Sequence, residues 1–106
     1  MFKEINIENR VSIKNEIIRL SNLLDAKYAA ELNFRNHCYL RIAYDNAVNN
    51  KWDNVIAKPF IKNANEDQLN VALMLLNNYV TDKVMLNNHN LLSLKFRDKT
   101  VQKSKK

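Results

Sequence analysis

A chain of 106 residues has room for one domain with a single modest core. Its composition, 46% hydrophobic and 26% charged, is that of an ordinary soluble protein and excludes disordered and fibrous classes. No apolar run approaches the length of a membrane span, and the complete absence of glycine excludes phosphate loops and the dinucleotide-binding fingerprint, because both depend on glycine.

The net charge of +6 is concentrated at the C-terminal end. Residues 95–106 carry a net charge of +5, so the rest of the chain is nearly neutral. The basic residues of this segment are Lys95, Arg97, Lys99, Lys103, Lys105 and Lys106. We therefore expect an acidic partner or nucleic acid to meet the tail rather than the body of the fold.

Two amphipathic stretches predict the first two helices. Ile13, Ile17, Leu20 and Leu24 recur at helical spacing, which predicts a helix over residues 10–28. Residues 31–48 are also helical in composition and are apolar on most sides, so we expect this second helix to be central.

Asparagine appears 18 times and is expected to take the place of glycine. The pair Asn49-Asn50 suits a helix C-terminus, because asparagine tolerates the left-handed conformation. Residues 51–64 contain the only tryptophan and the only proline, and predict an ordered connection with a helical turn near Trp52 that packs over the second helix like a lid.

Two further helices are predicted in the C-terminal half. Asn65 and Gln68 match a capping box and begin a helix over residues 66–80. Asp82 can cap a last helix over 83–96, in which Asn87-Asn88 is a potential break. The apolar face of that helix holds Met85, His89, Leu92 and Phe96.

The predicted fold class is all-α, a single compact domain of about four helices. It comprises a helical domain over residues 1–97 and a basic, flexible or disordered tail over 98–106. The conformation of residues 1–9 is left open.

The stretch around His37 is the one that could carry chemistry. On a helix His37, Arg41 and Tyr44 lie at i, i+4 and i+7, with Asp45 four residues after Arg41. One interpretation is a small pocket in which Arg41 holds an anion, His37 supplies a proton or hydrogen bond, and Tyr44 orients the ligand. Trp52 and Lys51 would close this pocket. The favoured interpretation is structural, with Arg41 and Asp45 paired and the other groups satisfied by the neighbouring connection.

Neither nucleophilic catalysis nor a metal site is expected. Cys38 follows His37 directly, and neighbouring helical residues diverge by about 100°, so the two cannot form a nucleophile and base pair. His37, Cys38 and His89 lack zinc-ligand spacing, and His89 is interpreted as a satisfied core histidine. We therefore predict no catalytic residue, metal or cofactor.

The pattern from His37 to Asp45, followed by Trp52-Asp53 and Pro59-Phe60, resembles small all-helical bacterial proteins to which no activity is assigned. The resemblance covers roughly residues 30–97. It implies a single helical domain and carries over no site residue.

The preferred hypothesis is a non-enzymatic interaction or accessory protein, with dimerisation through surplus apolar residues such as Ile5, Ile7, Ile18 and Leu94. The alternatives are an anion-binding or catalytic module at the His37 to Asp45 stripe, and weak sequence-blind nucleic-acid binding through the tail. The lone cysteine and the acidic N-terminal residues predict a cytoplasmic protein without a membrane partner.

Overall fold

The structure is a computed structural model that describes the backbone of residues 2–31 and 36–105 and the side chains of residues 10–31 and 37–97. Every regular element in those ranges is helical, which confirms the all-α prediction. The order along the chain is α1 (Phe2–Tyr28), α2 (Asn36–Val48), the 3-10 turn η1 (Trp52–Asn54), α3 (Phe60–Asn63), α4 (Glu66–Thr81) and α5 (Lys83–Lys105).

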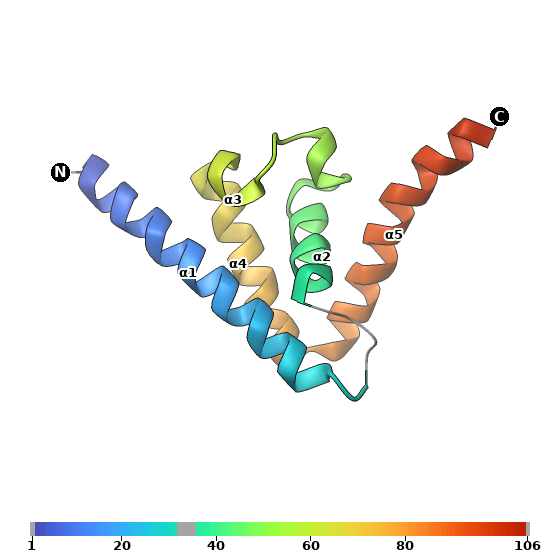
Figure 1. Ribbon diagram of the computed structural model, residues 1–106, viewed down its shortest axis with the longest axis horizontal. Coiled ribbons are helices and arrows are strands. Elements are labelled where there is room, and N and C mark those ends of the chain that lie inside the picture. The colour runs from blue at the N-terminus through green and yellow to red at the C-terminus, as the bar shows by residue number, and fades with distance from the viewer. Residues whose placement is uncertain (1, 32–35, 106) are drawn as a thin grey trace.

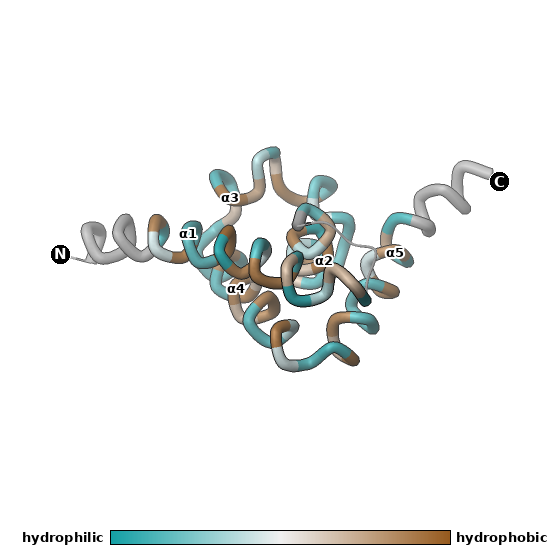
Figure 2. The backbone as a smooth tube through the Cα atoms, turned by 60° about the horizontal axis from the view of Figure 1, so that its bottom comes forward, coloured by the Kyte–Doolittle hydropathy of each residue, from teal (hydrophilic) through white to brown (hydrophobic). Residues whose placement is uncertain are grey.

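The second helix is central, as predicted. Helix α2 contacts α1, α4, α5 and η1, and Figure 1 shows it between α4 and α5. Helices α1 and α5 form the two outer arms, which diverge from the end of the molecule where α4 passes into α5. Figure 2 shows hydrophobic and hydrophilic positions alternating along the helices, as expected of amphipathic helices around one core.

The core is built from the predicted stripes. All four apolar residues that predict the first helix are buried, and from α4 they are met by fully buried Ala72, Leu76 and Tyr79. Burying side chains of this size stabilises each by about 1.5–3 kcal/mol relative to exposure. None of the described helices is long and apolar enough to cross a membrane.

Side-chain and backbone contacts close the joined end of the arms. The Tyr28 hydroxyl donates to the carbonyl oxygen of Tyr79 at 2.9 Å, near the C-terminal end of α4, where helix carbonyls lack intrahelical partners. Lys83 at the start of α5 pairs with Glu31 at 2.6 Å. These contacts hold the end of α1 against the junction of α4 and α5.

Some helix boundaries differ from the sequence expectation. Helix α1 begins at Phe2 rather than near residue 10, which also settles the backbone of most of the segment left open. Glu31 lies in a turn, residues 32–35 fall outside the described chain, and α2 begins at Asn36. Helix α5 is continuous through Asn87-Asn88 and runs on to Lys105, while the mobility of the tail stays a prediction.

The predicted helix ends are confirmed in detail. Asn49 has a φ of 55°, and the Asn50 N–H donates to the Asp45 carbonyl at 3.1 Å, which is the bonding pattern of a Schellman motif. Asn65 and Gln68 form both hydrogen bonds of the capping box, and Asp82 accepts from the Met85 N–H. Local chemistry thus places these ends.

Because Asn49 is the residue with positive φ in the described chain, its substitution tests asparagine as the substitute for glycine. Asn49→Ala should lower the free energy of unfolding by about 1 kcal/mol, since a Cβ without a local hydrogen-bonding group disfavours this conformation. Asn49→Gly should be at least as stable as the parent. Urea denaturation measures both, with exposed Asn77→Ala as the control. Equal stability of the Ala and Gly variants would contradict this account.

Candidate functional site

The polar stripe of α2 centres on a buried carboxylate. Asp45 has no exposed surface, and its Oδ2 atom accepts from the Ser93 hydroxyl at 2.6 Å and from Arg97 Nε at 3.0 Å. Its Oδ1 atom accepts from the Trp52 backbone N–H at 2.8 Å and from Arg97 Nη2 at 3.2 Å. The carboxylate therefore joins α2, the connection and α5 through charge-assisted bonds, including a bidentate arginine.

Arg41 does not take the predicted role of ion-pair partner to Asp45, because Arg97 does so. Its guanidinium instead donates to Asn90 Oδ1 at 2.8 Å and to Ser93 Oγ at 3.4 Å, both on α5. Burial lowers the pKa of Arg41, and the nearby positive charge of Arg97 acts in the same direction. The predicted pairing fails because α5, fifty residues away in sequence, supplies better-placed groups.

Tyr44 and Trp52 belong to an aromatic cluster with Phe60. The Tyr44 and Phe60 rings stack with centroids 3.8 Å apart, and Trp52 packs edge-on against both rings. Tyr44 is buried, and burial raises the pKa of its phenol. This cluster fixes the connection over α2, which confirms the predicted lid-like packing.

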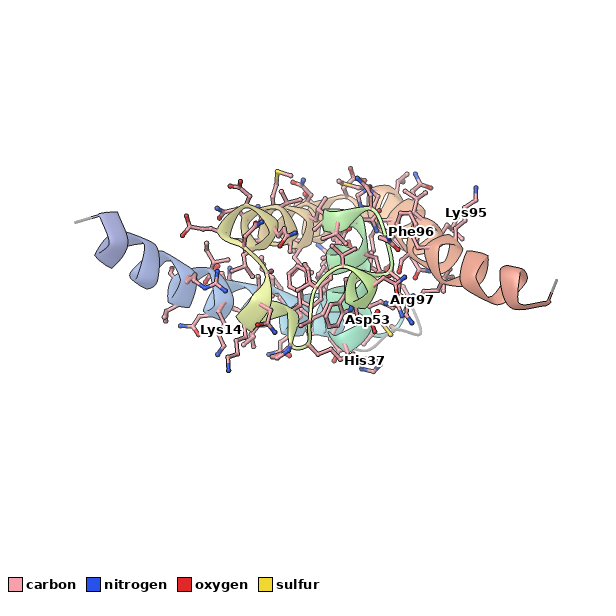
Figure 3. All side chains as sticks on the ribbon, turned by 90° about the horizontal axis from the view of Figure 1, so that it is seen from above. Lys14, His37, Asp53, Lys95, Phe96 and Arg97 are labelled. Carbon is pink, nitrogen blue, oxygen red and sulfur yellow. The ribbon has the colours of Figure 1, made fainter. Side chains whose placement is uncertain are left out.

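His37 and Cys38 lie at the edge of this network. His37 is exposed and Cys38 is half-buried, and Figure 3 shows His37 at the lower margin of the molecule. The structure thus brings together Asp45, Arg41 and, through the connection, Trp52, but leaves His37 at the surface. Whether these residues bind a ligand stays a prediction.

The other histidine is half-buried and has a hydrogen-bond partner, which confirms that His89 is satisfied but not that it is a core residue. His89 Nδ1 lies 2.6 Å from the Tyr79 hydroxyl, and the two rings pack at 90°. Burial lowers the pKa of His89, and the Asp82 charge opposes this shift. Among the described side chains, no group of three His, Cys, Asp or Glu residues could hold a metal ion.

The two described basic side chains of the C-terminal segment, Arg97 and Lys95, point in different directions. Arg97, predicted as a nucleic-acid contact, points back toward the connection, whereas Lys95 is exposed and points away from the body (Figure 3). The side chains of Lys99, Lys103, Lys105 and Lys106 lie outside the described residues. The guanidinium of Arg97 is thus already engaged by Asp45, while its role toward nucleic acid stays a prediction.

The residues that sequence reasoning missed are on α5. Leu86, Asn90, Ser93 and Arg97 recur at i, i+4, i+7 and i+11 and form the face that meets α2, whereas Leu92 of the predicted apolar face is 43% exposed. The signal was the spacing itself, hidden because most members of the stripe are polar. Comparison with protein-family models, characterised proteins and solved structures found no match for this chain.

We expect the Asp45 network to be essential for stability. Asp45→Asn removes the charge opposite Arg97 and should lower the free energy of unfolding by about 3 kcal/mol, because a buried ion pair that loses one partner leaves the other uncompensated. Asp53→Asn is the matched control, since Asp53 pairs only loosely with Lys51 and Lys58 at 3.9 and 3.7 Å. Chemical denaturation measures both, and equal losses would contradict a special role for Asp45.

A second expectation concerns pH. The pKa of His89 is lower in the folded chain than its ordinary value of 6.5, so the unfolded chain binds the proton more readily. Stability supplied by neutral His89 is therefore complete above about pH 6.5 and is lost as the pH falls below it. Denaturation midpoints across this window should fall with acidification in the parent and more weakly in His89→Gln. An unchanged slope in the variant would assign the effect to other groups.

Proposed function

We propose that this chain is a non-enzymatic interaction protein that associates with a second copy of itself through the outward face of α5. We define that face as Val84, Leu91 and Leu94. These side chains are 70%, 64% and 40% exposed, and their i, i+7, i+10 spacing puts them along one side of the helix. The exposed apolar stripe is the observation that carries the proposal.

The two faces of α5 support this reading. Leu86 and Ser93, also seven residues apart, are fully buried against the body. The outward face lies on the opposite side of the helix, where its three side chains are exposed. An amphipathic helix normally buries its apolar stripe, so an exposed apolar stripe on α5 favours a protein partner.

Charge along α5 favours two copies in antiparallel orientation. Residues 84–94 contain no Lys, Arg, Asp or Glu, while the basic segment begins at Lys95. Antiparallel pairing places Val84 of one copy opposite Leu94 of the other and keeps the two basic ends apart. Such a two-fold arrangement closes on itself and does not extend into a filament.

The interior of the molecule supports a non-enzymatic role. Asp45 and Arg41 are hydrogen-bonded to residues of α5, and the Tyr44 ring is stacked on Phe60. Catalytic groups must reach a substrate, whereas these bonds join helices to one another. In this proposal the basic tail attracts acidic partners to the dimer, and the single Cys38 suits a reducing compartment such as the cytoplasm.

Ile18, singled out from the sequence as a dimer contact, is 41% exposed on α1, on the other arm. The side chains of Ile5 and Ile7 lie outside the described residues. We propose the dimer contact on α5, because Leu94 there continues the exposed stripe of Val84 and Leu91.

The test is sedimentation equilibrium of the full chain over a wide range of concentrations. Leu91→Glu should weaken self-association by at least about tenfold, because it replaces a buried apolar contact with a charge. Val55→Glu is the matched control, since Val55 is 51% exposed and lies on the connection. A parent that stays monomeric, or two variants that behave alike, would reject the α5 interface.

A further inference from the structure

A groove with cationic and apolar lining lies on the other arm of the molecule. It lies between α1 and the segment around α3 and has a volume of about 470 Å³. The six residues that line it are Arg10, Val11, Lys14, Pro59, Ile61 and Lys62. This volume falls in the range of about 300–1,000 Å³ that is usual for ligand-binding pockets.

The described side chains that line the groove are cationic and include no acid. Arg10, Lys14 and Lys62 contribute three positive charges, and no acidic residue is among its six lining residues. Neither Lys14 nor Lys62 forms an ion pair with any described side chain, and the nearby Glu16 is held by Arg19 in a 2.8 Å contact. Figure 3 shows Lys14 on α1 beside this end of the connection.

Arg10 gives the groove a fixed wall. Its Nη2 atom donates to the carbonyl oxygens of Ile61 at 3.2 Å and Lys62 at 2.9 Å, and so ties α1 to α3. A guanidinium has five N–H donors, so donors remain for a bound carboxylate. The two lysines, by contrast, are exposed and free to adjust to a partner.

The floor of the groove is apolar. Val11 is 54% exposed, and Pro59 and Ile61 complete the surface between the cations. A purely ionic partner would leave this floor in water, whereas a partner with one apolar side chain would cover it.

We infer that this groove binds an acidic peptide segment of a protein partner, with one apolar side chain against Val11 and Ile61 and flanking carboxylates against Lys14 and Lys62. Charge complementarity selects this occupant, because three cations exceed what a single carboxylate would balance. In such a peptide the acidic residues match the lysines of the groove, and the apolar residue between them matches its apolar floor. The site is separate from the α5 face, so it stands or fails independently of self-association.

Calorimetric titration of the full chain with a synthetic peptide tests the inference. The probe is a capped peptide with one leucine between two pairs of glutamates, compared with the same peptide carrying serine instead. The leucine peptide should bind about tenfold more tightly, reflecting partial burial of the side chain. Equal affinity of the two peptides, or no binding of either, would overturn the proposal.

Charge-matched variants locate the site. Lys14→Glu/Lys62→Glu should weaken binding of the leucine peptide by about tenfold or more, because two attractive pairs become repulsive. Lys27→Glu/Lys95→Glu changes the net charge equally at exposed lysines outside the groove and should have little effect. Equal losses in both would assign binding to overall charge and the tail, and would reject the groove. Circular dichroism checks folding, with Lys14→Gln/Lys62→Gln as the milder pair.

Amide chemical shifts and sedimentation complete the test. The peptide should perturb the backbone amides of Val11 and Ile61, whereas shifts confined to the C-terminal segment would overturn the assignment. Loss of a dimer in Lys14→Glu/Lys62→Glu would show that a second copy fills the groove, which also contradicts the peptide site. Loss of the dimer only in Leu91→Glu leaves the inference standing.

Discussion

The buried carboxylate of Asp45 is the constraint on which the arrangement of the helices depends. A charged group without solvent costs several kcal/mol unless it is paired and hydrogen-bonded, so its partners must arrive together when the chain folds. They come from three places: the Trp52 backbone N–H in the connection, and Ser93 and Arg97 on α5. Any displacement of α5 along α2 would break this set, so the carboxylate fixes the register between the two helices.

The same constraint explains which side of α5 faces the body. Hydrophobicity alone would turn Met85, Leu92 and Phe96 inward, yet Leu92 is 43% exposed. The polar stripe of Asn90, Ser93 and Arg97 turns inward instead, because Asp45 and Arg41 of α2 need partners there. Polar satisfaction and the burial of Leu86 act together in orienting this helix, with Met85 and Phe96 half-buried beside that face.

The features that the sequence predicts correctly are those set by residues close together along the chain. The left-handed Asn49, the Asn65 capping box and the Ile13 to Leu24 stripe depend on residues within a few positions of one another, and the structure confirms all three. The side-chain partners of Asp45 lie 48 and 52 residues away, and nothing in the local pattern around His37 to Asp45 identifies them. Arg41 looked equally suitable because it is one helical turn away, and only the packing of α5 decides between the two arginines.

This partition of polar groups also bears on function. The residue types that suggest chemistry in the sequence, a carboxylate and two arginines, are engaged in contacts between helices. The surface features on which the proposals rest are of two other kinds. On α5 they are aliphatic, at Val84 and Leu91, and along α1 and α3 they are cationic around a small apolar floor. The aliphatic side chains favour binding because a partner excludes water from them, and the cationic side chains favour it through a partner of opposite charge. The outer arms α1 and α5 thus present different surface chemistry, and under the proposed interaction role each would meet a different kind of partner.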